Sequence, residues 1–227
     1  MSRQDVCRRI EEVGVIPVVR APSAELAVRA AEALVAGGLT VVELTLTVPD
    51  AVAVIRSLCA RFAGRAVVGA GTVLSAEHAT ASVEAGAAFV VSPGLVTDAI
   101  GAAHAMGAVA VPGALTPTEV MSAVRAGADM VKIFPCSAVG GPKYIRALRA
   151  PLPDVKLVPT GGVTLATAAE YIAAGAAALG VGSELVDLAA LSAGGDAVLA
   201  ERASELAAVV RAAVSARSPS RASGASG

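Results

Sequence analysis

Short runs of β-branched residues alternate with longer alanine-rich stretches along most of the chain. The short runs are apolar at nearly every position, which is typical of parallel strands that are covered on both faces. The longer stretches have the spacing of amphipathic helices. The pattern predicts eight strands, over residues 15–20, 40–46, 66–70, 88–91, 108–111, 130–134, 156–159 and 177–181. A helix is predicted after each strand, over residues 23–36, 49–62, 75–84, 97–106, 116–126, about 143–148, 164–173 and about 195–213.

A recurring Ala-Gly pair marks the points where a helix is followed by the next strand. It occurs at positions 36–37, 85–86, 126–127 and 174–175, and glycine there favours the left-handed conformation that ends helices. Eight such units in about 200 residues predict a single (β/α)8 barrel over residues 1–216. A doubly wound open sheet is the alternative. It is disfavoured because Ala21-Pro22-Ser23, and no glycine-rich dinucleotide loop, follows the first strand.

The segments at both ends of the chain lie outside this repeat. The segment before Gly14 predicts an extra helix that closes the floor of the barrel. It is a charged mixture without the apolar core of a signal peptide. Residues 217–227 contain mainly Arg, Ser, Ala and Gly, a composition that predicts a disordered tail.

The mean hydropathy of +0.70 raises the question of a membrane span. A spanning helix requires roughly 18–20 nearly uninterrupted apolar residues. The best candidates, residues 102–115 and 173–181, are shorter or are broken by Gly, Pro or His. We therefore expect a soluble, cytoplasmic protein without membrane contact.

Composition excludes several other classes of function. The chain has 227 residues, a formal net charge of -1 and only 2% aromatic residues, so we expect no binding to nucleic acid by charge or by base stacking. Three cysteines are an odd number without paired spacing, so no disulfide framework and no zinc site is predicted. We expect neither a metal nor a cofactor.

Two ionisable residues interrupt predicted strands. Glu43 lies inside the apolar run 41–46, and Lys132 lies in the run 130–134. Burying a carboxylate without a partner or a solvent-filled cavity is costly. A buried lysine amine loses its proton more readily and can then attack carbonyl compounds. A structural ion pair between Glu43 and Lys132 is the alternative interpretation.

Other polar residues follow the predicted strands, where barrel enzymes carry their chemistry. Arg20 ends the first strand and could bind a carboxylate through two parallel hydrogen bonds. Thr72 follows Gly69-Ala70-Gly71, whose small residues let a ligand approach the backbone. Pro93 and Phe134 offer apolar walls.

Two late glycine-rich loops predict a phosphate site. Thr160-Gly161-Gly162 follows the seventh strand, and Gly180-Val181-Gly182-Ser183 follows the eighth. A short helix is predicted to open at Glu184. Loops after strands seven and eight, with backbone N–H groups at a helix start, commonly bind phosphate in such barrels.

Together these segments resemble the family of 2-keto-3-deoxy-6-phosphogluconate (KDPG) aldolases, which includes 4-hydroxy-2-oxoglutarate (KHG) aldolases. The resemblance runs in order from about Gly14 to Val186. It is carried by seven segments, 43–47, 69–72, 91–94, 111–113, 132–135, 159–162 and 180–183. It implies a class I aldolase barrel, usually a homotrimer, that splits 2-dehydro-3-deoxy-6-phospho-D-gluconate into pyruvate and D-glyceraldehyde 3-phosphate. The substrate is a small phosphorylated keto acid, and neither a metal nor a cofactor is needed.

The resemblance also implies roles for individual residues. Lys132 would form the Schiff base with the keto carbon, and Glu43 would be the general acid and base. The pyruvate end would be lined by Thr72 and Pro93, with Phe134 nearby. The phosphate would be held by Gly161, Gly162 and Ser183, with Thr160 beside it. Gly182, in the same loop as Ser183, would be a further substrate-binding position.

One position departs from the family pattern. Many members have an arginine, which helps to bind the substrate carboxylate, at the place of Thr47. We expect Arg20 to take over that task, while Thr47 remains at the substrate site.

Three alternatives stay open at this point. The same chemistry could act on 2-dehydro-3-deoxy-6-phosphogalactonate, which differs at one stereocentre, or on unphosphorylated 4-hydroxy-2-oxoglutarate. The barrel could be a non-catalytic phosphosugar-binding or scaffold protein. It could also be a phosphate-binding isomerase or synthase, although such an enzyme does not need a lysine with these neighbours.

Overall fold

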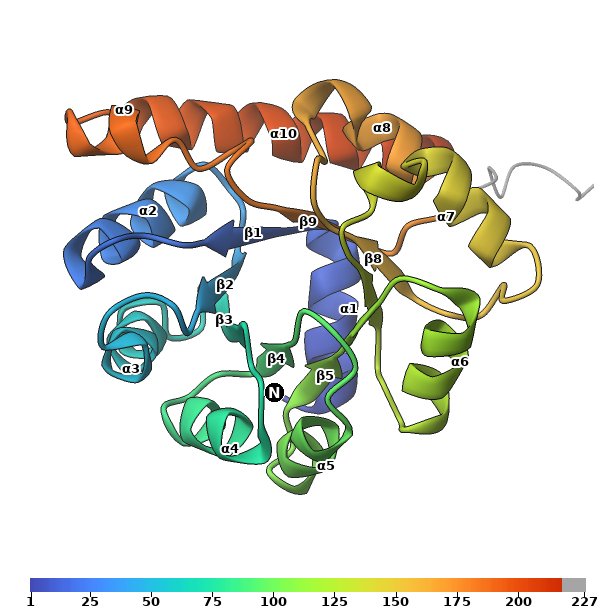
Figure 1. Ribbon diagram of the computed structural model, residues 1–227. Coiled ribbons are helices and arrows are strands. Elements are labelled where there is room, and N and C mark those ends of the chain that lie inside the picture. Colours follow the sequence, from blue (N-terminus) through green and yellow to red (C-terminus); the bar gives the residue numbers. More distant parts are fainter. Residues whose placement is uncertain (218–227) are drawn as a thin grey trace, which may run out of the picture.

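Parallel strands form two curved sheets in the computed structural model, which describes residues 1–217 (Figure 1). The larger sheet has the order β5-β4-β3-β2-β1-β9, and the smaller has the order β6-β7-β8. The strands are β1 (Val15–Val19), β2 (Val41–Thr45), β3 (Val67–Gly71), β4 (Phe89–Val91), β5 (Val109–Val111), β6 (Gly113–Ala114), β7 (Val131–Ile133), β8 (Leu157–Pro159) and β9 (Leu179–Val181).

Hydrogen bonds across two seams join the sheets into a barrel. The N–H of Lys132 donates to the carbonyl of Pro112 at 2.9 Å, and the N–H of Ala177 donates to the carbonyl of Leu157 at 2.9 Å. Strands β5 and β6 together occupy one barrel position and are separated by Pro112, which has no N–H to donate. The prediction of an eight-stranded parallel barrel is confirmed.

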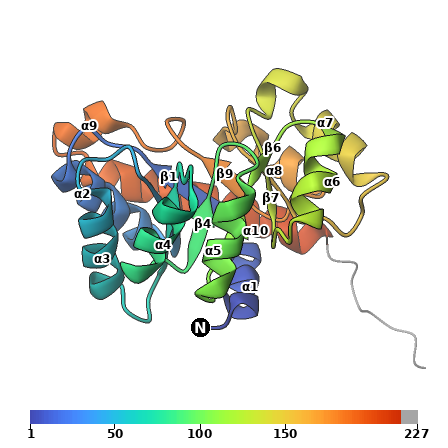
Figure 2. The same cartoon turned by 60° about the horizontal axis from the view of Figure 1, so that its bottom comes forward.

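Helices cover the outside of the barrel (Figure 1; Figure 2). Four of the outer helices begin after a Ser or Thr whose side chain accepts a hydrogen bond from a backbone N–H of the first turn, where that N–H has no partner within the helix. These capping residues are Ser23, Ser75, Thr116 and Thr164. The helices on the outside are α2 (Ala24–Ala36), α3 (Ala51–Arg61), α4 (Ala76–Glu84), α5 (Thr97–Ala105), α6 (Pro117–Arg125), α7 (Pro142–Arg149), α8 (Leu165–Ala173), α9 (Leu188–Ser192) and α10 (Asp196–Arg217). None of the helices in residues 1–217 is long and apolar enough to cross a membrane.

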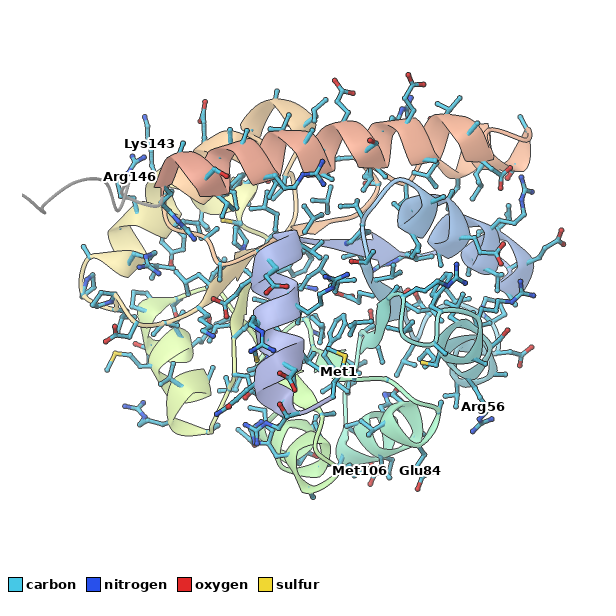
Figure 3. The ribbon with its side chains drawn as sticks, turned by 180° about the vertical axis from the view of Figure 1, so that it is seen from behind. Met1, Arg56, Glu84, Met106, Lys143 and Arg146 are labelled. Atoms are coloured by element: carbon cyan, nitrogen blue, oxygen red, sulfur yellow. The ribbon has the colours of Figure 1, made fainter. Side chains whose placement is uncertain are left out.

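The N-terminal helix α1 (Arg3–Val13) crosses one end of the barrel (Figure 3). Its Val6 and Ile10 are buried against a layer of interior side chains from the strands, which includes Ile16, Val41 and Phe89. This packing closes the end at which the strands begin. The predicted extra helix at the barrel floor is confirmed.

Two parts of the C-terminal region differ from the expectation. The predicted helix at Glu184 is wrong: a turn follows β9, with the N–H groups of Leu185 and Val186 donating to the carbonyl of Gly182. The next helix, α9, begins only at Leu188, where the carboxylate of Asp187 accepts a hydrogen bond of 3.0 Å from the N–H of Ala190. Helix α10 also extends beyond the expected end at residue 213.

Arg217, assigned to the tail from sequence, is the last residue of α10. It donates hydrogen bonds to the carbonyls of Ile172 and Ala176 at 3.3 and 2.8 Å, and these contacts hold the helix end. The rest of the predicted tail, residues 218–227, lies outside the described residues.

Candidate active site

A cavity of about 590 Å³ opens where the strands end, opposite helix α1. The residues expected at the site come from both sheets and from the loops that follow the strands. All twelve of them line this cavity: Arg20, Glu43, Thr47, Thr72, Pro93, Lys132, Phe134, Thr160, Gly161, Gly162, Gly182 and Ser183. The structure therefore brings together every candidate position, while their roles stay predictions.

Lys132 and Glu43 project into the barrel interior from β7 and β2. Their exposed fractions are 8% and 3%. Within residues 1–217, neither side chain makes a hydrogen bond, and no ion pair joins them. A structural salt bridge, the alternative to a catalytic pair, is therefore not formed here.

Burial raises the pKa of the Glu43 carboxyl group, and the positive charges of Lys132 and then Arg20 oppose that rise. The net shift of the pKa is upward, because the loss of hydration destabilises the carboxylate more than its attraction to these two charges stabilises it. A carboxyl group with a raised pKa holds its proton more readily than an ordinary carboxyl group, which suits a group that has to both accept and donate a proton.

The lysine amine also lies close to an aromatic ring. Its Nζ is 5.1 Å from the ring centroid of Phe134, a distance at which the ring face attracts a cation. Phe134 is 39% exposed and precedes Pro135 through a cis peptide bond. The ring thus forms an apolar wall beside the amine that would also be next to a bound iminium ion.

Thr47 lies at the cavity wall without a charge to offer. Its hydroxyl is 2.8 Å from the hydroxyl of Thr45, which is fully buried. This contact fixes the side chain of Thr47. Arg20, by contrast, is exposed and makes no hydrogen bond or ion pair within the described part of the chain. Its guanidinium group is free to bind an anionic ligand.

Thr72 has a backbone conformation that side chains rarely adopt. Its φ is 58°, in the left-handed region, where a β-branched residue is an outlier. Holding such a residue there costs of order 1–3 kcal/mol, and such strain is found mainly at functional sites. Thr72 lies at the cavity directly after β3, so the strained backbone coincides with the predicted site.

The loop after β8 presents backbone donors to the cavity. Gly161 and Gly162 have φ values of 89° and 71°, which glycine adopts without steric cost. Within residues 1–217, no backbone hydrogen bond uses the N–H groups of Gly161, Gly162 or Ser183. Free N–H groups clustered in a loop attract anions. The loops can therefore bind phosphate without the helix start that was expected at Glu184.

Sequence reasoning did not assign seven residues of the cavity lining to the site. Most are apolar and carry no local signal, because they look like ordinary core positions. They are Val18, Ala21, Pro22, Val163, Glu184, Val186 and Leu188. Gly180, which belongs to the predicted phosphate loop, also lines the cavity. Glu184 is the exception among the seven, because sequence reasoning treated it only as the start of a helix. It adds an exposed carboxylate beside the predicted phosphate loops.

No group of three His, Cys, Asp or Glu side chains suited to a metal ion occurs within residues 1–217. Cys136, close to the site in sequence, is fully buried, and burial raises the pKa of its thiol to about 11. A thiol with that pKa is a poor nucleophile.

A family model described as KDPG and KHG aldolase matches residues 6–200 of the chain. The chain belongs to this aldolase family. The predicted family and the predicted class of enzyme are therefore confirmed.

Named relatives in the family differ in their substrates. The KHG/KDPG aldolase of Escherichia coli (strain K12) is 40% identical over 180 residues, covering 79% of this chain and 84% of that protein. The 2-dehydro-3-deoxy-6-phosphogalactonate aldolase of the same strain is 37% identical over 171 residues, covering 75% and 83%.

Solved structures agree with this membership. KDPG aldolase from Legionella pneumophila, with pyruvate captured as a covalent carbinolamine intermediate, has a TM-score of 0.81 and 31% identity, covering 88% of this aldolase and 97% of that chain. A cube-shaped protein cage designed by fusing symmetric oligomeric domains has a TM-score of 0.80 and 32% identity, covering 89% and 74%.

Proposed function

We propose that this protein is a class I aldolase that cleaves 2-dehydro-3-deoxy-6-phospho-D-gluconate into pyruvate and D-glyceraldehyde 3-phosphate. It also splits 4-hydroxy-2-oxoglutarate into pyruvate and glyoxylate. The observation that carries the proposal is a buried lysine and a buried carboxyl group, Lys132 and Glu43, facing one cavity without being paired to each other. A non-catalytic scaffold would gain nothing from the cost of burying both groups.

The first half of the reaction forms the imine. The Nζ of Lys132 attacks the C2 keto carbon and forms a carbinolamine, with the proton moved through Glu43. Loss of water then gives a positively charged iminium ion beside the ring of Phe134. That ion draws electrons from the neighbouring carbon, so no metal is required.

Bond cleavage follows from a second proton transfer. Glu43 removes the proton of the C4 hydroxyl group, the C3–C4 bond breaks, and its electron pair moves into the iminium ion to give an enamine. The C4 fragment leaves as the aldehyde. Glu43 then returns a proton to C3, and hydrolysis of the imine releases pyruvate and the free amine of Lys132.

The two anionic ends of the substrate need separate partners. We assign the carboxylate to Arg20 and the phosphate to the N–H groups of Gly161 and Gly162 and the hydroxyl of Ser183. Pro93 and Thr72 line the pyruvate end. The unpaired state of Arg20 and the free N–H groups of the loop support this orientation.

Replacing Arg20 tests the assignment of the carboxylate. Arg20→Ala should raise KM about tenfold or more, since a hydrogen bond between charged groups contributes about 1.5–3 kcal/mol. Arg56→Ala, at an exposed arginine on α3, is the control and should leave KM unchanged. Unchanged KM and turnover in Arg20→Ala would contradict the assignment.

Trapping with borohydride tests the proposed function directly. Incubation with pyruvate and borohydride should add one reduced pyruvyl group, mapped by peptide mass to Lys132. The adduct should be absent from Lys132→Ala and present in Lys143→Ala, which removes an exposed lysine of α7. A folded protein that forms no adduct would refute the imine mechanism.

The galactonate epimer is a second candidate substrate, favoured by the 37% identity to a 2-dehydro-3-deoxy-6-phosphogalactonate aldolase. Both epimers carry the same carboxylate and phosphate groups, so Arg20 and the late loops serve either one. Comparing kcat/KM for the two epimers, with pyruvate release as the readout, decides between them.

We further propose a cytoplasmic homotrimer. The similarity to a cage designed from symmetric oligomeric domains supports an oligomer. Helix α6 supports a protein contact as well, because Met121 and Val124, three positions apart, are 46% and 44% exposed. Three unpaired cysteines fit a reducing compartment.

A further inference from the structure

Gly71 ends strand β3 directly beneath the carboxyl group of Glu43. The strand register pairs Glu43 with Gly69 and Thr45 with Gly71. The side chain of Glu43 therefore leans along its strand by one interior layer, toward the cavity. A Cβ atom built on Gly71 would lie 1.8 Å from Oε1, 2.5 Å from Cδ and 2.8 Å from Cγ of Glu43. The carboxyl group occupies the space that any other residue would fill.

We infer that Gly71 is a positioning residue, whose missing side chain forms the seat that holds the Glu43 carboxyl group at the reacting end of the cavity. This inference rests on the proposed function of Glu43 as the general acid and base. It differs from the sequence-based expectation that Gly69-Ala70-Gly71 is small so that a ligand can approach the backbone.

The backbone around Gly71 is held firmly, so the carboxyl group must yield to an added methyl group. Strand β3 is paired with β2 on one side and with β4 on the other. The carbonyl of Gly71 also accepts a hydrogen bond of 2.8 Å from the N–H of Leu46. The φ of Gly71 lies outside the left-handed region, so alanine fits its backbone conformation.

Gly69, two positions earlier on the same strand, provides a contrast. A Cβ atom on Gly69 would lie 2.3 Å from the ring of Phe89, which is fully buried in the layer below. Gly69 thus makes room for a core side chain, whereas Gly71 makes room for a chemical group. An added methyl at position 71 needs the flexible end of Glu43 to retreat by about 1 Å or more, because real Cβ contacts are not found under 3.0 Å.

Gly71→Ala tests the inference. Its kcat should fall about 10- to 100-fold, because displacing a reacting group by 1 Å can cost about 100-fold, while KM and Tm change little. Gly94→Ala, in the loop that follows the neighbouring strand β4, adds a methyl group with nothing within 4 Å and should leave kcat unchanged. If Gly71 instead leaves room for the ligand, KM rises and kcat is kept, and the inference is wrong.

A double variant shows whether the effect passes through Glu43. In a Glu43→Gln background, Gly71→Ala should lower the remaining kcat by less than about twofold, since coupled residues are not additive. Losses that multiply in full would overturn the inference.

The ionisation of Glu43 gives a readout that does not depend on activity. The difference in unfolding free energy between a chain and its Glu43→Gln variant, followed against pH, reports the titration of that group. Gly71→Ala should move this titration to lower pH, because the displaced carboxylate is better hydrated. If the titration does not move, the inference about Gly71 is refuted, and this outcome does not depend on whether the protein cleaves an aldol substrate. Failure of the borohydride test alone would refute only the proposed function.

Discussion

At the scale of single residues, Glu43 combines the proposed chemical role with an energetic cost. It is 3% exposed and makes no hydrogen bond within the described residues. Two cations, on Lys132 and Arg20, compensate for its charge only in part. A residue of this kind lowers stability at the pH at which it works.

Glu43→Gln should therefore stabilise the protein at neutral pH while lowering turnover to a small remainder. Burial raises the pKa of Glu43 in the folded protein. Below the pKa of the unfolded chain the group is protonated and costs no folding free energy, and stability is lost as pH rises through the pKa of the folded protein. Urea unfolding should show equal stability of both chains near pH 4 and a more stable variant at pH 7. Equal stability at both pH values would contradict this prediction.

Glu184 places a carboxylate where the substrate phosphate is expected. It is exposed and lies next to Ser183 at the cavity, so it should repel a dianion. Glu184→Gln should lower KM for the phosphorylated substrate about two- to threefold at low salt, with a smaller effect at higher ionic strength. Borohydride trapping with pyruvate should be unchanged, and Glu170→Gln, on the outer helix α8, should behave as the parent. An effect independent of salt would speak against repulsion.

At the scale of elements, Asp129 joins the N-terminal helix to the barrel. It accepts hydrogen bonds from Arg3 of α1 at 2.6 Å and from the N–H of Ala110 in β5 at 2.9 Å, and His104 of α5 lies 2.8 Å away. Burial would raise the pKa of Asp129, but the hydrogen bond from Ala110, followed by Arg3 and His104, lowers it below 3.8. This one carboxylate links three elements at the closed end of the barrel.

Asp129→Asn should weaken the attachment of helix α1 to the barrel. We expect a loss of about 2 kcal/mol in unfolding free energy at pH 7, the size of a hydrogen bond between charged groups. Because the pKa is lowered, this stability is present above about pH 3.8 and is lost as pH falls through the folded pKa, so the two chains should converge in acid. Asp154→Asn, at an exposed position, is the control in denaturant titrations. A constant difference at all pH values would mean that charge is not the cause.

At the scale of the whole molecule, the proposed trimer depends on an exposed apolar surface. Met121→Asp combined with Val124→Asp should convert a trimer of 22.2 kDa subunits into monomers in light scattering, because charges in an apolar interface are costly to bury. Val198→Asp, at a 45% exposed position on α10, should keep the parent mass. A monomeric parent would disprove the trimer, and a trimeric double variant would place the interface elsewhere.

Much of the fold could be predicted from local patterns. Apolar runs and capping residues such as Ser23 and Thr116 indicate where elements begin. The continuation of the strand past Pro112 was missed because proline normally ends a strand. In the structure, the N–H of Gly113 donates to the carbonyl of Gly94 on one side, and Gly113 pairs with Lys132 of β7 on the other. The helix expected at Glu184 failed for a related reason. Glycine-rich loops allow several turn types, and the tertiary contacts choose one.

The sequence by itself determined the repeat, the class of barrel and the positions at which charged residues interrupt strands, because these depend on spacing along the chain. Only the tertiary structure decided that Lys132 and Glu43 stay unpaired, that Val186 and Leu188 reach the same cavity, and that the carboxyl group of Glu43 lies where a side chain at position 71 would be. Such contacts depend on strand register around the closed barrel and on the volume of neighbouring side chains. Neither is encoded in a local pattern of apolar and polar residues.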